Sequence, residues 1–242
     1  MVNPNKNSIS LSGKPLVVGT VHSPGSLAVA RRLPSSAVDL LELRVDNFAT
    51  APDELLRVAE KLRPPLLVTV RDQTEGGALA LSAAKRLTLF EQFLPHAAMI
   101  DVELRAAQKL APLLTHAQEN GLRVLLSHHD FARTPSAKKL HDLARRAREN
   151  GADIFKVAAL VKTPRGLAAL LDFLASEKSL PLAVMGMGEH FGKISRLLFA
   201  ACGSVLNYGY LDRANASGQW PARLLKTRIA EVCASAIHES KK

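Results

Sequence analysis

Short apolar runs recur along the chain, separated by longer segments that mix apolar and polar residues. Eight of these runs are continuous rather than alternating, as expected for parallel strands that are buried on both faces. The pattern therefore predicts eight strands, at residues 15–21, 37–45, 65–71, 97–104, 122–129, 152–160, 180–187 and 202–211.

The segments between these strands carry apolar residues at the i, i+3, i+4 spacing of amphipathic helices. Two of the segments end at Gly121 and Gly151, and glycine is common directly after a helix because it adopts the left-handed backbone conformation. The predicted helices are 52–62, 82–94, 105–120, 136–150, 163–177, 193–203 and 220–240.

The alternation of strands and helices predicts the fold. Eight strand–helix units within 242 residues are typical of a (β/α)8 barrel, the TIM-barrel form of the α/β class. We expect one domain over 1–242, with 1–14 as a flexible or barrel-capping lead-in. An open doubly wound sheet is the alternative. However, the segment after the first strand, GTVHSPG, lacks the G-x-G-x-x-G fingerprint of dinucleotide-binding sheets.

The charge of the chain is strongly positive, with a formal net charge of +10 at pH 7. Such a balance can indicate a nucleic-acid partner. Here the basic residues are dispersed, for example at 31–32, 138–139 and 145–148, and aromatic residues make up only 5% of the chain. We therefore expect no nucleic-acid partner, and interpret the charge as solvated helix faces and a funnel for an anionic small molecule.

The sequence also predicts a cytoplasmic location. No apolar run approaches the roughly 20 residues of a membrane span, and the polar start of the chain does not resemble a signal peptide. The two cysteines, Cys202 and Cys233, form no disulfide framework and are expected to be buried free thiols in a reducing compartment.

One predicted strand, in GADIFKVAAL at 151–160, contains Lys156 within an otherwise apolar run. Burying an unpaired ammonium is costly. Either the stem is covered while the amine reaches water, or desolvation favours the neutral amine and makes it available as a nucleophile.

Ionisable residues follow the ends of five successive predicted strands, which is where barrel active sites lie. Three arginines among them suggest an anionic substrate held by bidentate contacts, although a pair of strand-end charges can also be purely structural. A lysine and a histidine on neighbouring strands suggest imine chemistry with proton transfer. Because His128 and His129 are adjacent, only one of them should face the barrel centre. The residues are Glu42, Arg44, Asp46, Arg71, Glu75, Asp101, Glu103, His128, His129, Lys156 and Arg196.

As a set, several segments resemble the type I 3-dehydroquinate dehydratase family of the shikimate pathway. They follow the family's order from residue 39 to residue 219: DLLELRVD (39–46), LLVTVRDQTEGG (66–77), IDVEL (100–104), LLSHHDF (125–131), ADIFKVA (152–158), MGMGEHFGKISR (185–196), FAACGSVLNYG (199–209) and SGQ (217–219).

The resemblance implies a barrel that is a homodimer, with no metal and no cofactor, and a role in aromatic amino-acid (chorismate) biosynthesis. It implies that 3-dehydroquinate is the substrate, that Lys156 forms an imine with its ketone, that His129 is the general acid and base, and that Glu75 orients His129. It also implies a substrate-binding set of Glu42, Arg44, Arg71, Arg196 and Gln219.

The chain departs from the family at two positions where a serine is common. The end of the first strand has Gly19 followed by Thr20, and Asn215 stands four residues before Gln219. An asparagine can still hydrogen-bond a substrate, so we include Asn215 in the substrate-binding set. We expect the glycine-punctuated loop 188–192 to be a lid.

Two other functions remain open from the residues alone. Another lysine-imine barrel enzyme, such as a class I aldolase, would cleave a carbon–carbon bond and grip a phosphate. A non-enzymatic basic binding protein would leave the buried charges unexplained. A catabolic quinate route is the alternative to biosynthesis.

Overall fold

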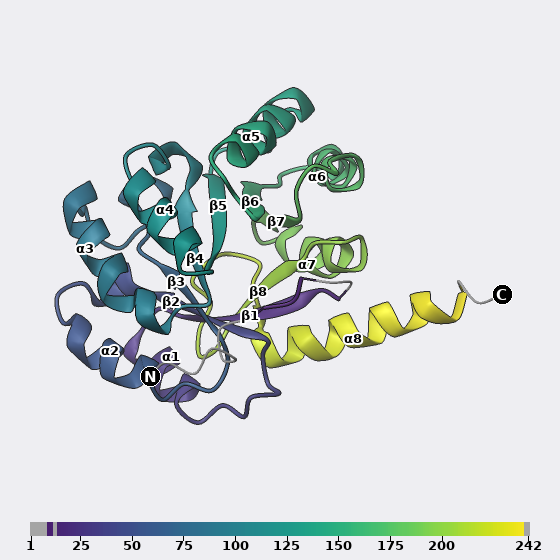
Figure 1. Ribbon diagram of the computed structural model, residues 1–242. Helices are drawn as coiled ribbons and strands as arrows, with labels where there is room; N and C mark the ends of the chain where they lie inside the picture. The colour runs from purple at the N-terminus through teal and green to yellow at the C-terminus, as the bar shows by residue number, and fades with distance from the viewer. Residues whose placement is uncertain (1–8, 12–13, 240–242) are drawn as a thin grey trace.

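Eight parallel strands curl into a ring that helices surround, in a computed structural model that describes residues 9–11 and 14–239 (Figure 1). The predicted barrel is confirmed, and each predicted strand is present. The strands are β1 Leu16–Val21, β2 Leu40–Arg44, β3 Leu66–Thr69, β4 Met99–Glu103, β5 Arg123–Asp130, β6 Ile154–Leu160, β7 Leu182–Met187 and β8 Leu206–Tyr210.

The ladder order is β7-β6-β5-β4-β3-β2-β1-β8-β9, and contacts between β7 and β8 close the ring. The Val205 amide donates to the Leu182 carbonyl at 2.9 Å, and the Val184 amide donates to Ser204 Oγ at 3.0 Å. These bonds join β7 and β8 only at their amino ends. Farther along, a short strand that the pattern did not predict, β9 (Trp220–Pro221), pairs with β8. The barrel therefore has a seam between the carboxyl halves of β7 and β8.

The helices cover the outside of the ring, and seven of them were predicted. The unpredicted one, α1, has seven residues, too few for a periodic signal, and begins at a capping box between Ser23 and Ser26. The predicted helix over 105–120 begins only at Ala111. The α-helices are α1 Pro24–Ala30, α2 Pro52–Ala59, α3 Ala83–Phe93, α4 Ala111–Glu119, α5 Ala137–Glu149, α6 Pro164–Ser176, α7 Gly192–Ala201 and α8 Ala222–Glu239. The 3-10 helices are η2 Val45–Phe48, η3 Gln73–Glu75, η4 Leu94–His96 and η5 Leu104–Ala106.

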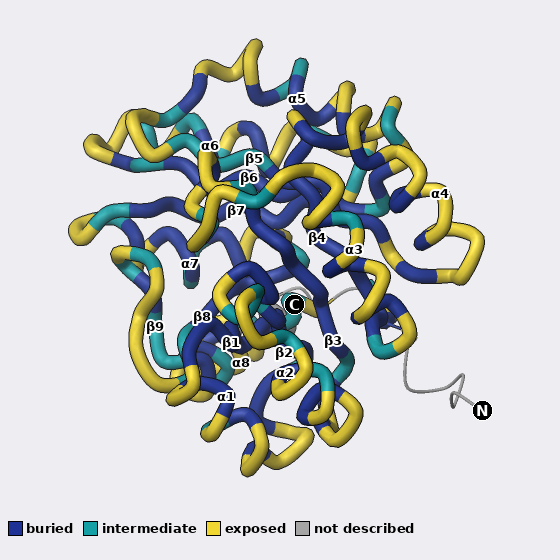
Figure 2. Tube along the Cα trace, turned by 90° about the vertical axis from the view of Figure 1, so that its left-hand side faces the viewer, coloured by how far each residue is buried: buried dark blue, intermediate teal, exposed yellow. Residues whose placement is uncertain are grey.

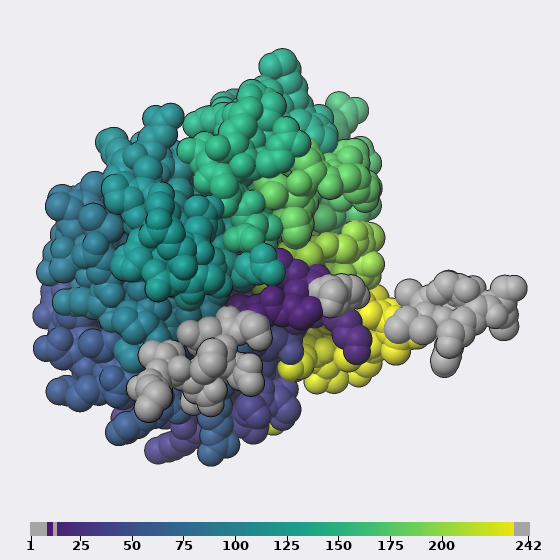
Figure 3. Space-filling view, in the orientation of Figure 1, coloured from purple at the N-terminus to yellow at the C-terminus, as the bar shows by residue number. Residues whose placement is uncertain are grey.

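Helix α8 extends away from the barrel (Figure 1), and in the space-filling view its described residues, in yellow, lie at the lower right of the molecule (Figure 3). None of the helices in the described part of the chain is long and apolar enough to cross a membrane. The expectation of two buried thiols was wrong, because Cys202 is exposed and Cys233 is half-buried, although both are free.

Buried residues run through the strands, while exposed residues lie on the helices and loops (Figure 2). Inside the ring, the amino-terminal layer of side chains is apolar and includes Leu40, Leu67, Met99 and Ile154. Ile9 joins this cluster, and the rest of the predicted lead-in, apart from residues 10, 11 and 14, lies outside the described residues. The apolar layer fills the barrel's amino end, so any polar site inside must lie toward the carboxyl ends.

Candidate active site

Two residues along from the apolar layer, the inward-facing position becomes polar on every strand of the ring except β7, where it is Met185. Side chains alternate along a strand, so Leu40 is followed on the same face by Glu42, and Met99 by Asp101. All members of this polar layer are buried, with at most 4% of their surface exposed. They are Thr20, Glu42, Thr69, Asp101, Ser127, Lys156 and Tyr208.

Lys156 lies at the centre of this layer and is 4% exposed, so the interpretation in which its amine reaches bulk water is wrong. Nζ donates to Asp101 Oδ2 at 2.9 Å and lies 3.9 Å from Glu42 Oε1. Nζ also lies 4.0 Å from the ring centroid of Tyr208. Two carboxylates and an aromatic face therefore surround the Lys156 nitrogen.

Asp101 is fixed between two cations. Arg71 Nη2 donates to Asp101 Oδ2 at 2.7 Å, and Arg71 Nη1 donates to Glu103 at 3.0 Å and Ser127 at 2.7 Å. Burial opposes ionisation of Asp101, but Arg71 and Lys156 hold its pKa far below the usual range. Conversely, Asp101 and Glu103 hold the pKa of Arg71 above its ordinary value despite burial. Asp101 is thus a permanent anion beside the amine.

Glu42 is oriented by two threonine hydroxyls. Thr20 donates to Oε2 at 3.1 Å and Thr69 donates to Oε1 at 3.1 Å. The hydroxyl of Thr20 therefore supplies a hydrogen-bond donor to Glu42 at the end of β1. With both oxygens held, the carboxylate faces Lys156 in one orientation.

His129 is paired with Glu75, which ends η3. Glu75 Oε2 accepts the His129 backbone amide at 2.9 Å and lies 2.9 Å from His129 Nδ1. Burial, together with the charges of Arg71 and Lys156, holds the pKa of His129 well below its usual value. Burial also raises the pKa of Glu75 to about 7, although Arg71 opposes this. The imidazole is therefore neutral at pH 7, with Nδ1 engaged and Nε2 not held by Glu75.

Strand register brings His129 close to the amine. Lys156 pairs with Ser127, and His129 is two residues farther along β5, on the same inward face. His128 points to the opposite face and is half-buried, as the adjacency of the two histidines predicted.

Arg44, at the end of β2, makes a bidentate pair with Asp46 in η2, with contacts of 2.9 and 2.8 Å. Its Nη2 also donates to the Gly76 carbonyl at 2.9 Å, beside Glu75. Arg44 therefore connects the second strand to the loop that holds the histidine's partner.

Arg196 comes from helix α7, outside the ring, and contacts both strands of the β7–β8 seam. Its Nη1 donates to the Tyr208 carbonyl at 3.2 Å and lies 3.6 Å from Met185 Sδ. It is 2% exposed, and no carboxylate of the described residues forms an ion pair with it. Burial alone lowers its pKa to about 10. Arg196 is thus a buried cation that lacks an anion.

The loop that carries Asn215 and Gln219 docks on the start of α7. A Cβ on Gly218, which has φ +79°, would lie 2.5 Å from the Gly192 Cα, so both glycines are needed for this approach. Arg196 Nε donates to the Gly218 carbonyl at 3.2 Å. Gln219 Oε1 accepts the Asn215 amide at 3.0 Å. The contact places Arg196 and Gln219 on one side of the barrel mouth.

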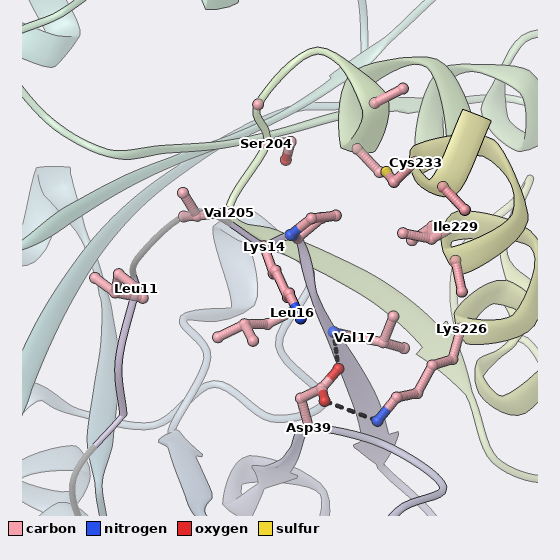
Figure 4. A pocket seen from close by; sticks show the side chains of 16 residues that line it. Leu11, Lys14, Leu16, Val17, Asp39, Ser204, Val205, Lys226, Ile229 and Cys233 are labelled. Carbon is pink, nitrogen blue, oxygen red and sulfur yellow. Dashed lines mark hydrogen bonds and ion pairs between the residues drawn. The ribbon is translucent and has the colours of Figure 1, made fainter. Parts of the chain in front are cut away.

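A separate cavity of about 680 Å³ opens near the amino ends of β1 and β8, against α8 (Figure 4). Its charged wall is an ion pair of 2.7 Å between Lys226 and Asp39. None of the side chains of the polar layer lines it. This cavity is therefore not the place where Lys156 or His129 would meet a substrate.

All nine residues predicted for the site are thus at the carboxyl-end half of the barrel, but the structure adds two that were not assigned, Asp101 and Tyr208. Within the described residues, no group of three or more histidine, cysteine, aspartate or glutamate side chains could hold a metal ion.

Comparisons with known proteins agree with this geometry. The sequence model of the type I 3-dehydroquinase family matches residues 16–230. The chain is 31% identical over 234 residues to the 3-dehydroquinate dehydratase of Enterococcus faecalis, covering 90% of this chain and 92% of that protein. It is 34% identical over 206 residues to that of Methanocella arvoryzae, covering 85% of this chain and 91% of that protein.

A solved structure is similar over nearly the whole chain. It is the type I 3-dehydroquinate dehydratase from Clostridium difficile with covalent modified comenic acid. The two have a TM-score of 0.85 and 26% sequence identity, covering 95% of this chain and 96% of that chain.

Proposed function

Because the chain belongs to the type I 3-dehydroquinase family of hydro-lyases, we propose that it dehydrates 3-dehydroquinate to 3-dehydroshikimate through an imine on Lys156. The observation that carries the proposal is a buried amine and a buried, unpaired guanidinium in one barrel. An amine suits a ketone, and a guanidinium without an anion suits a carboxylate. 3-Dehydroquinate carries both a ketone and a carboxylate.

Imine formation comes first. The neutral Lys156 amine attacks the ketone carbon to give a carbinolamine. The carbinolamine hydroxyl then takes up a proton from solvent and leaves as water, which gives a protonated imine. Asp101 and Glu42, at 2.9 and 3.9 Å from Nζ, stabilise the positive charge that the nitrogen carries in the imine. Their carboxylates thus favour the positively charged intermediate.

Elimination follows at the neighbouring carbons. The protonated imine withdraws electrons, so the C2 proton becomes acidic enough for neutral His129 to remove it, and an enamine forms. The resulting imidazolium returns the proton to the C1 hydroxyl, which leaves as water while the enamine electrons restore the imine. Hydrolysis of that imine releases product and regenerates Lys156.

The remaining predicted residues would bind and orient the substrate ring. We propose that Arg196 takes the carboxylate, with Gln219 and Asn215 beside it. Glu42, Arg44 and Arg71 would contact the hydroxyl-bearing side of the ring. Accurate placement matters because orienting the reacting groups can lower the activation free energy by roughly 7–11 kcal/mol relative to a bimolecular encounter.

The overall reaction is tested by adding 3-dehydroquinate and following the ultraviolet absorbance of the conjugated double bond that dehydration creates. We expect a rise in absorbance that stops when the substrate is consumed. A class I aldolase would instead produce carbon–carbon cleavage fragments from a phosphorylated ketose, and activity of that kind alone would refute the proposal.

Replacing Arg196 by methionine is expected to raise KM by about 10- to 100-fold, because a charged hydrogen bond contributes about 1.5–3 kcal/mol. kcat should change less, since the carboxylate does not react. Arg86 provides the contrast. It is equally buried but is paired with Glu103 and Asp72, so Arg86→Met should lower thermal stability. An unchanged KM in Arg196→Met would remove Arg196 from the carboxylate site.

The pH dependence of turnover should report Glu75. When Glu75 is ionised, it accepts Nδ1–H and leaves Nε2 of His129 unprotonated, as a base requires. Because the pKa of Glu75 is about 7 in the ligand-free protein, kcat/KM should fall about tenfold per pH unit below 7 and level off above 8. In Glu75→Gln this acidic limb should disappear and the maximal rate should drop. A limb that persists near pH 7 in the variant would assign it to another group.

We also propose a single-domain homodimer in the cytoplasm, with a biosynthetic role. One continuous sheet from β1 to β9 and a family match over 16–230 support one domain, and two free thiols suit a reducing compartment. Light scattering at the working concentration tests the dimer.

We propose that loop 188–192, in which Glu189 and His190 are exposed, closes over the bound substrate.

A further inference from the structure

Tyr208, on β8, touches two functional groups of the barrel at once. Its ring centroid lies 4.0 Å from Lys156 Nζ, and its backbone carbonyl accepts a hydrogen bond of 3.2 Å from Arg196. A substrate that reaches from the amine to the guanidinium must therefore pass along this residue.

The hydroxyl of Tyr208 is buried and has no hydrogen-bond partner among the described residues. Buried tyrosine hydroxyls usually find a partner, because an unmade hydrogen bond leaves the cost of desolvation uncompensated. A phenylalanine would fill the same space without that cost. The hydroxyl without a partner therefore indicates a bound ligand that supplies the missing hydrogen bond.

The surroundings of this hydroxyl indicate what kind of group it meets. The charges of Glu42, Asp101 and Arg71, which come from β2, from β4 and from the end of β3, act on the phenol. Burial, followed by the two carboxylates, raises the pKa of the phenol well above its ordinary value. It is thus a neutral donor, and it lies at the far end of the residue from the carbonyl that binds Arg196. The ligand group beside it belongs to the part of the substrate near the imine rather than to the carboxylate.

We propose that the Tyr208 hydroxyl forms a hydrogen bond with a ring hydroxyl of the bound substrate, while the ring face of Tyr208 holds the Lys156 nitrogen in position. The proposal rests on the proposed function, because it assigns a further substrate contact in the same site. It makes Tyr208 a binding residue that recognises a hydroxylated cyclic ketone.

The first test is Tyr208→Phe, which keeps the ring and removes only the hydroxyl. We expect KM to rise about three- to tenfold, as for the loss of one neutral hydrogen bond, with kcat changed less. In the ligand-free protein the melting temperature should stay equal or increase, because an unsatisfied polar atom has been removed. An unchanged KM, or a lower melting temperature, would overturn the proposal, since the hydroxyl would then be idle or bonded within the protein.

The second test pairs the variant with substrate analogues that lack the hydroxyl at C4 or at C5. In the wild-type protein, one of these analogues should lose affinity, and in Tyr208→Phe the same deletion should cost nothing further. Such coupling is the signature of a direct contact. Additive losses with both analogues would contradict the contact.

Ser204→Ala is the matched control, because it removes a buried hydroxyl from the residues that lead into the same strand. Ser204 Oγ accepts the Val184 amide at 3.0 Å, at the opposite end of the barrel from the seam. Its loss should lower the melting temperature and leave KM unchanged.

The failure of this assignment can be distinguished from the failure of the proposed function. If the wild-type protein neither turns over 3-dehydroquinate nor forms an adduct with it, the proposed function fails. If it does both and Tyr208→Phe is unaffected, only the assignment of Tyr208 fails.

Discussion

Lys156→Met is expected to lose turnover by more than about 10³-fold, because the imine is the electron sink for the reaction and no other group can form it. Methionine matches the length of the lysine stem and fills the same space inside the barrel, beside Tyr208. The Asp101 carboxylate retains its pair with Arg71 at 2.7 Å, so the variant should fold. The measurement is the single-turnover rate with 3-dehydroquinate, together with the loss of any covalent adduct.

Lys138 provides the control for charge removal. Its side chain is 89% exposed on α5 and makes only a surface pair with Asp142. Lys138→Met removes the same charge from the protein and should leave kcat/KM unchanged within about twofold, since exposed pairs contribute little. Near-wild-type turnover in Lys156→Met would refute the imine mechanism outright.

His129→Ala is expected to separate the two halves of the reaction. Lys156 keeps its partners, so the imine should still form, but C2–H would lack a base and C1–OH would lack an acid. General acid–base catalysis typically contributes about 10²–10⁴-fold, so elimination should slow by that factor while the adduct accumulates. The mass spectrum after borohydride trapping reports the intermediate, and the absorbance assay reports elimination.

His128→Ala is the matched control for this experiment. His128 precedes His129 on β5, and its side chain points to the other face of the strand and is half-buried. We expect its loss to leave both imine formation and elimination within a fewfold of wild type. If His128→Ala blocks elimination and His129→Ala does not, the assignment of the base is reversed.

The sequence allowed the barrel to be predicted because parallel strands that are buried on both faces are continuous apolar runs, and eight of them alternate with amphipathic segments. Helix α1 was missed since seven residues held by a serine capping box leave no periodic pattern. Strand β9 was missed because two residues, Trp220 and Pro221, carry no pattern at all.

The candidate site was predicted in its members but not in its internal pairing. Alternation in IDVEL placed Asp101 and Glu103 on one face, yet which cation each would meet depends on the register of β3, β4 and β6. The sequence did not indicate the 2.9 Å contact between Lys156 Nζ and Asp101. The sequence analysis did not single out Tyr208, because a hydroxyl without a hydrogen-bond partner can be recognised only in the folded chain.

The arrangement around Arg196 shows why a helix residue can belong to a barrel interior. The Arg196 side chain reaches the interior between the carboxyl halves of β7 and β8, which are not paired with each other. The close contact of Gly192 with Gly218 keeps the start of α7 near this seam. A linear pattern contains neither feature. The sequence could indicate an arginine after the glycine-punctuated loop, but the absence of a neighbouring anion is a property of the folded chain.

The most direct test of the central claim is the intact mass of the protein after addition of 3-dehydroquinate and sodium borohydride, followed by peptide mapping. The account predicts a reduced adduct on the peptide that contains Lys156, absent without substrate and absent in Lys156→Met. An adduct on another lysine, or no adduct on a folded protein that still dehydrates the substrate, would contradict it.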